Sequence, residues 1–116
     1  MTKNKIKLLP QVMDFRLNDS GKPEKMIQSK IMTYLKTVPN SNFFKVAQGP
    51  WSKGGISDIC GCYCGRSIAM EAKTKTGKPT PLQIKFLNNN VLAGGYSAIV
   101  RSVEDVKKIL EKVKNG

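Results

Sequence analysis

Apolar positions along the chain follow two spacings, and these separate the predicted helices from the predicted strands. The three- and four-residue spacing of an amphipathic helix follows Pro23, Pro81 and Ser102. Short aliphatic and aromatic runs predict strands at 43–47 and 96–100, and a β-hairpin spans residues 56–73. The order α-β-β-β-α-β-α predicts an α/β fold in which helices flank a mixed β-sheet.

Residues with special backbone preferences mark where the helices begin. Pro23 and Pro81 suit the first turn of a helix, and Thr80 is placed to cap the second one. Ser102 and Asp105 form an S-x-x-D pattern, which predicts a capping box at the last helix.

Other short segments predict turns and breaks. Residues 39–42 are expected to end the first helix and turn the chain, and Gly94-Gly95 ends the second helix. Asn88-Asn89-Asn90 is expected to fray because asparagine is a poor helix former. The strand–helix–strand unit from Glu71 to Val100 predicts a parallel crossover.

The hairpin brings two carboxylates together. With the turn at Cys64-Gly65, or over residues 63–66, Asp58 lies directly opposite Glu71. Cβ atoms of cross-strand neighbours are roughly 5 Å apart, so the carboxylates repel unless a divalent cation lies between them. Lys73 is two residues beyond Glu71 and shares its face. This set favours metal-assisted phosphodiester hydrolysis.

The charge balance of the chain indicates which kinds of partner it can bind. Its 116 residues form one small domain, and 20 Lys and Arg against 8 Asp and Glu give a net charge of +12. Such a charge favours a polyanion, first nucleic acid and only then an anionic membrane surface. No apolar run reaches the roughly 18 residues of a membrane helix, and no apolar signal core begins the chain. We therefore expect a cytoplasmic protein with no membrane partner.

The chain contains no histidine, which excludes Ser-His-Asp and Cys-His catalysis. A metal site must then use carboxylates, which select Mg²⁺, with Mn²⁺ as a substitute. Cys60, Cys62 and Cys64 alternate along one predicted strand. One interpretation is a zinc site, but such a site needs a fourth ligand and usually has Cys-x-x-Cys spacing. The simpler interpretation is that the three cysteines are small apolar residues on a strand.

Residues 1–21 form a basic N-terminal arm that precedes the predicted domain at 22–116. Pro10 breaks any helix there, and no clean period emerges. Three alternatives stay open for the arm: disorder, contact with DNA, or packing on a partner subunit.

The order of motifs resembles a known family. Asp58 followed by Glu71-Ala72-Lys73 resembles the D…(D/E)-x-K signature of restriction-endonuclease-like nucleases. Residues 24–28, 55–58, 80–83 and 93–105 surround it in an order similar to that of the virus-type replication-repair nuclease (VRR-NUC) domain, over residues 22–114. One departure is Ser57, because the family usually has proline before the aspartate.

The resemblance implies a restriction-endonuclease-like core and roles for particular residues. Asp58, Glu71 and the backbone carbonyl of Ala72 would bind Mg²⁺, and Lys73 would orient the attacking water. Glu24 would hold a second metal or its water shell; alternatively it is an acid that the helix dipole favours. Gln83, expected to point inward, would fix the geometry of a phosphate or a water.

Four further residues are candidates for nucleic-acid contact. Lys75 and Lys78 lie in a basic loop after the hairpin, where lysines can approach phosphates. Trp51 and Lys53 lie in a glycine-rich loop and could stack on or clamp nucleic acid, although Trp51 could equally be a packing residue.

The substrate follows from the family's lone-domain members, which are often phage-encoded and resemble homodimeric enzymes acting on four-way DNA junctions. A phage-encoded enzyme would work in the host cytoplasm. A flap or nicking endonuclease is the alternative within enzymes. A basic DNA-binding module without catalysis is the alternative from another class. None of these functions calls for a small-molecule cofactor.

Overall fold

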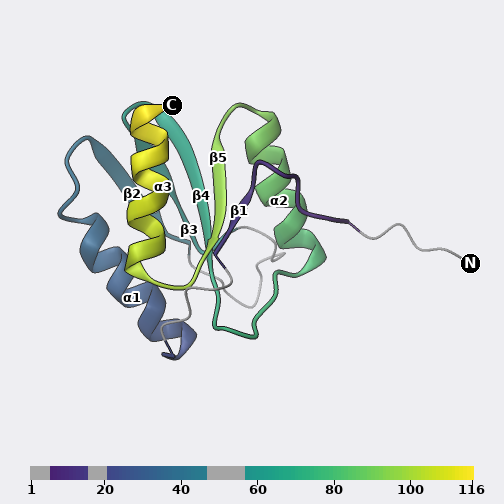
Figure 1. Cartoon of the computed structure of the whole chain (residues 1–116). Coiled ribbons are helices and arrows are strands. Elements are labelled where there is room, and N and C mark those ends of the chain that lie inside the picture. Colours follow the sequence, from purple (N-terminus) through teal and green to yellow (C-terminus); the bar gives the residue numbers. More distant parts are fainter. Residues whose placement is uncertain (1–5, 16–20, 47–56) are drawn as a thin grey trace, which may run out of the picture.

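A computed structural model, which describes residues 6–15, 21–46 and 57–116, shows one mixed sheet with helices on both faces (Figure 1). The strand order is β1-β5-β4-β3-β2; β1, β5 and β4 are parallel, and the β4–β3 and β3–β2 pairs are antiparallel. The elements are β1 (Met13–Asp14), α1 (Glu24–Leu35), β2 (Ser41–Lys45), β3 (Ile59–Tyr63), β4 (Arg66–Ala72), α2 (Pro81–Leu92), β5 (Tyr96–Val100) and α3 (Val103–Asn115). The predicted α/β class, the order of seven elements and the parallel crossover are confirmed.

The helices divide the core into two layers. Helices α1 and α3 pack together on one face of the sheet, and α2 packs against β4 and β5 on the other. The larger apolar cluster lies under α1 and α3 and includes Ile31, Met70 and Ile109. A smaller cluster under α2 includes Leu87 and Ile99. Within the described ranges, no helix is long and apolar enough to span a bilayer.

Both predicted helix caps are present, but one of them differs from the expected pattern. Thr80 caps α2 through a complete capping box with Gln83. Ser102 Oγ accepts a hydrogen bond from the Asp105 N–H at 3.3 Å, which is one half of the box predicted at α3. The Asp105 carboxylate instead accepts the Arg101 N–H at 2.7 Å. The capping box at α3 was therefore wrong in its second half, because Asp105 reaches the residue before the N-cap.

The asparagines of α2 do not fray the helix, so that prediction was wrong. Helix α2 continues to Leu92 because two of its asparagines bond to neighbouring segments. Asn88 accepts the Leu9 N–H at 2.9 Å and donates to the Lys7 carbonyl at 2.8 Å. Asn90 donates to the Tyr96 carbonyl at 2.7 Å. These tertiary hydrogen bonds outweigh the low helix propensity of asparagine.

The described part of the N-terminal arm joins the sheet, an outcome that none of the three alternatives anticipated. Met13 and Asp14 pair in parallel with Ala98 and Ile99 of β5. Val12, only 6% exposed, completes the apolar cluster under α2. Strand β2 also begins earlier than predicted: Ser41 and Asn42, expected in a turn, pair with Tyr63 and Cys62.

Candidate functional site

The hairpin places Asp58 and Glu71 against each other at one end of the sheet. The β3–β4 register pairs Ile59 with Met70 and Tyr63 with Arg66, which is the predicted register. The Asp58 N–H donates to Glu71 Oε1 at 3.2 Å, and Asp58 Oδ2 accepts the Ala72 N–H at 3.0 Å. The predicted pairing of Asp58 with Glu71 is confirmed.

The turn of this hairpin fixes that register. Its two central residues, Cys64 and Gly65, have φ values of 51° and 80°. Positive φ at both positions is the requirement of a type I′ turn, whose twist matches that of paired strands. Because the side-chain period of a strand is two, a slip by one residue would move Glu71 to the opposite face. The turn chemistry therefore decides which face carries the carboxylate.

Burial and a neighbouring charge make Glu71 an unusual acid. Its side chain is 1% exposed. Burial raises the pKa of Glu71 from 4.5 to about 8, with the Asp58 carboxylate as the next cause and the Lys73 ammonium opposing both. Lys73 Nζ lies 3.4 Å from Glu71 Oε2 and is itself only 12% exposed. In the absence of a cation, the site thus favours a proton on Glu71 near neutral pH.

Arg101 organises the segment that follows Lys73. Its buried guanidinium donates to the carbonyl oxygens of Thr74 at 3.0 Å and Gly77 at 3.1 Å. It also pairs with Asp14 of β1 at 2.8 Å. The loop that carries Lys75 is therefore bound through Arg101 to the N-terminal strand. Sequence reasoning missed this role because no local pattern links residues 14, 74 and 101.

Cys60 lies on the same face as the carboxylate pair. Its Sγ is 3.1 Å from the hydroxyl of the buried Ser57. Burial raises the pKa of Cys60, the Ser57 contact opposes this rise, and the charges of Glu71 and Asp58 add to it. Interpreting the cysteines as small apolar strand residues holds for Cys60 alone, since Cys62 and Cys64 are exposed.

Glu24 and Gln83 occupy different places from the pair. Glu24 begins α1 on the opposite face of the sheet, although α1, α2 and α3 all begin at the end where β4 finishes (Figure 1). In the described part of the chain, no three His, Cys, Asp or Glu side chains gather as a metal site, so Glu24 does not join the pair. Gln83 Oε1 accepts the Thr80 N–H at 2.9 Å. The T-x-x-Q spacing was the signal for this cap.

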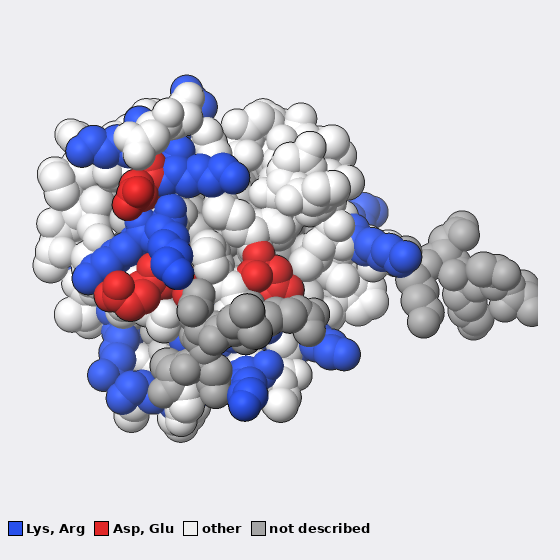
Figure 2. Space-filling model, viewed as in Figure 1, with Lys and Arg blue, Asp and Glu red and all other residues white. Residues whose placement is uncertain are grey.

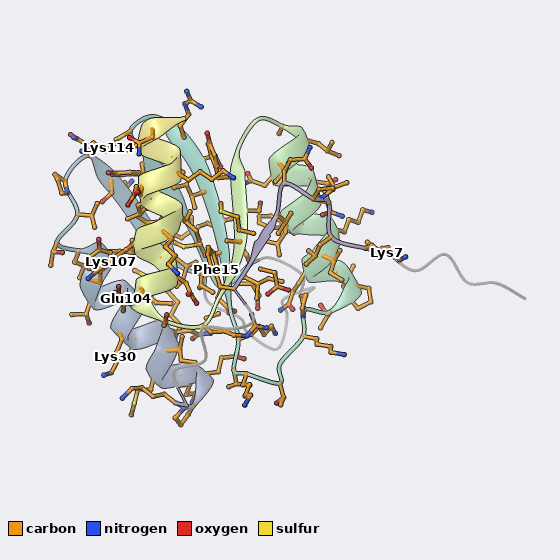
Figure 3. All side chains as sticks on the ribbon, in the orientation of Figure 1. Lys7, Phe15, Lys30, Glu104, Lys107 and Lys114 are labelled. Carbon is orange, nitrogen blue, oxygen red and sulfur yellow. The ribbon has the colours of Figure 1, made fainter. Side chains whose placement is uncertain are left out.

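Among the described residues, lysines lie on the helices of both faces of the sheet. Lys75 and Lys78 are exposed in the loop between β4 and α2, as predicted. Lysine side chains also gather over α1 and α3, with acidic side chains among them (Figure 2). Lys30, Lys107 and Lys114 lie on these two helices (Figure 3), and Lys107 pairs with Glu104 at 3.2 Å. Trp51 and Lys53 lie outside the described residues.

Comparisons of the chain with protein-family models, with curated proteins and with solved structures find no match.

Proposed function

We propose that this protein is a divalent-metal-dependent DNA endonuclease that hydrolyses phosphodiester bonds. The observation that carries the proposal is the contact of Asp58, Glu71 and Lys73 at one end of the sheet. A protein that only binds DNA gains nothing from carboxylates placed where phosphates approach, because like charges repel. A hydrolytic site needs them, since they hold the cation that neutralises the phosphate.

The donor atoms fit Mg²⁺, with Mn²⁺ as a substitute. Asp58, Glu71 and the carbonyl of Ala72 offer hard oxygen ligands, and Mg²⁺ binds through one or two carboxylates while it keeps several waters. The elevated pKa of Glu71 is a second indication, because burial and the Asp58 carboxylate together outweigh the single ammonium of Lys73, and a divalent cation would supply further positive charge. When bound, the cation would lower the pKa of a coordinated water and stabilise negative charge on the phosphate.

The chain's own residues would orient the reaction around that cation. Lys73 would move its ammonium from Glu71 toward the attacking water and the phosphate. Gln83 has committed its oxygen to the helix cap, so its amide N–H groups would do the positioning. Arg101 would keep Lys75 near the DNA backbone by fixing its loop.

The substrate we propose is branched DNA, namely the four-way (Holliday) junction. A homodimer would cut it during DNA repair. The order of α1 to α3 and β2 to β5 supports a restriction-endonuclease-like core of the VRR-NUC type. The charge of +12 supports a DNA substrate. A junction has near-twofold symmetry, and a twofold dimer would supply two sites with matching symmetry. A flap or nicking enzyme is the alternative. The setting would be the cytoplasm.

The test is cleavage of four-way junctions, flaps and linear duplex with Mg²⁺ or with EDTA. We expect paired nicks in the junction with Mg²⁺ and none with EDTA. Glu71→Gln should abolish cutting and retain binding, because the basic surface is unchanged. Light scattering should show a dimer. A monomer that cuts only flaps would favour the flap nuclease, and intact DNA with wild-type protein and Mg²⁺ would favour the binding module.

A further inference from the structure

Beside the carboxylate pair, the sheet carries an exposed aromatic side chain. Phe44 of β2 is 55% exposed, although it lies in the interior of a paired strand. It pairs with Cys60, and cross-strand partners share a face, so Phe44 projects from the face that carries Asp58 and Glu71. Helix α2 packs on β4 and β5 of that face, while β2 forms the edge of the sheet.

The strand register places this ring close to Asp58. Asp58 is two residues before Cys60, so Phe44 and Asp58 are diagonal neighbours, with Cα atoms about 7–8 Å apart. The Val46 N–H donates to the Asp58 carbonyl at 2.7 Å, which extends the ladder to this point. Paired backbone, rather than a loop, therefore fixes Phe44 relative to the carboxylates.

Among the described residues, the ring has Asn42, Val46, Cys60 and Cys62 as neighbours on its face of the sheet. Asn42 is exposed on the same face, two residues from Phe44, and Cys62 pairs with it. A chain of net charge +12 attracts a polyanion to such a surface, and an aromatic ring offers that polyanion a stacking platform. Every base has a π-face, but inside a duplex both faces are covered by the neighbouring bases, so a side chain stacks on an interior base only where that base has left the stack.

We propose that Phe44 stacks on an unpaired nucleobase adjacent to the phosphate held at Asp58 and Glu71. The inference rests on the proposed function and specifies its substrate: DNA whose strand is splayed beside the cut, as at a branch point. Blunt duplex offers no such base, so Phe44 contributes to selection of branched over linear DNA. A second copy of this chain seated on Phe44 is the competing occupant.

The test is binding, measured in EDTA so that no cleavage occurs. The probe is a branched duplex with 2-aminopurine in its unpaired strand at the branch, compared with blunt duplex of the same sequence. Stacking contributes about 1–3 kcal/mol per base, so Phe44→Ala should weaken branched-DNA binding about 5- to 150-fold. Blunt duplex binding should change less than about twofold. Quenching of the 2-aminopurine should be lost.

Three further variants separate stacking from apolar contact and from folding. Phe44→Trp should retain quenching and affinity, whereas Phe44→Leu should behave like Phe44→Ala because it lacks a ring. Leu92→Ala is the matched control, since Leu92 is 74% exposed at the far end of α2. Circular dichroism should show all four variants folded, because both side chains are largely in solvent.

Two outcomes overturn the proposal. One is an equal loss on branched and blunt DNA, or none on either. The other is a dimer that dissociates in Phe44→Ala, which would assign the ring to an interface between copies. Cleavage assays with Mg²⁺, run in parallel, separate the hypothesis that the protein is a nuclease from the hypothesis that Phe44 stacks on a base. Ring-dependent binding without cutting would defeat the nuclease alone, and normal cutting and binding by Phe44→Ala would defeat the stacking alone.

Discussion

Glu71→Gln should stabilise the metal-free protein at alkaline pH while it removes a ligand of the proposed metal site. The pKa of Glu71 rises from 4.5 to about 8 on folding, mainly through burial and then through Asp58. Between these pH values the folded state keeps a proton that the unfolded state has lost. Stability therefore falls as pH rises from 4.5 toward 8, and the full penalty is present above 8.

The size of the effect follows from the same pKa difference. Each pKa unit corresponds to about 1.4 kcal/mol, so wild type loses roughly 5 kcal/mol over this window. Glutamine carries no charge and can accept the Asp58 N–H as Glu71 Oε1 does. Its amide nitrogen would face the Lys73 ammonium, which Glu71 Oε2 contacts at 3.4 Å, and this offsets about 1–2 kcal/mol. We expect a net gain of about 3–4 kcal/mol at pH 9.

Urea unfolding at several pH values in EDTA measures this difference. Near pH 4 Glu71→Gln should be about 1–2 kcal/mol less stable than wild type, because its amide nitrogen faces the Lys73 ammonium, and the order should reverse as pH rises. The exposed Glu111→Gln is the matched control and should follow wild type. Saturating Mg²⁺ at pH 8 should stabilise wild type by about 2.7 kcal/mol at 100 times Kd, and the variant by much less. Parallel pH curves for wild type and Glu71→Gln would refute the buried-carboxylate reasoning.

Five further substitutions test other parts of the structure. Lys73→Ala should reduce kcat far more than the affinity for DNA. Lys75→Ala should instead lower the slope of the logarithm of DNA affinity against the logarithm of salt concentration by about 0.9. Equal effects of the two substitutions on kcat would make Lys73 another phosphate contact. Arg101→Met should lower the free energy of unfolding by about 3–5 kcal/mol, because it removes the buried guanidinium that bonds to Asp14 and to the carbonyls of Thr74 and Gly77. A loss below about 1 kcal/mol in urea would contradict this role of Arg101. Gly61→Ala should destabilise the protein by about 1–3 kcal/mol, since a methyl group there overlaps the backbone oxygen of Asn42. An unchanged Tm would show that β2 and β3 can move apart enough to accept the methyl group. Cys64→Asn should raise stability by up to about 1 kcal/mol, because Asn tolerates the φ of 51° in this turn better; a lower Tm would show that the thiol matters.

Local chemistry in the sequence determined the order of helices and strands and the contact between the two carboxylates. Alternation along β3 and β4 and the turn at Cys64-Gly65 were enough to place Asp58 against Glu71. Thr80 and Pro81 were enough to start α2. These features depend on residues within one turn or one hairpin, so they are legible without knowledge of the rest of the chain.

Contacts between distant segments were decided only by the tertiary structure. Arg101 meets Asp14 across 87 positions, and Asn88 meets Lys7 across 81. Glu24 begins α1 on the face opposite the carboxylates, which its own helix pattern does not reveal. Such placements depend on how helices and sheet pack, and packing is a sum over many weak contacts. A periodic pattern shows which side of an element is buried, but it does not identify the element that covers that side.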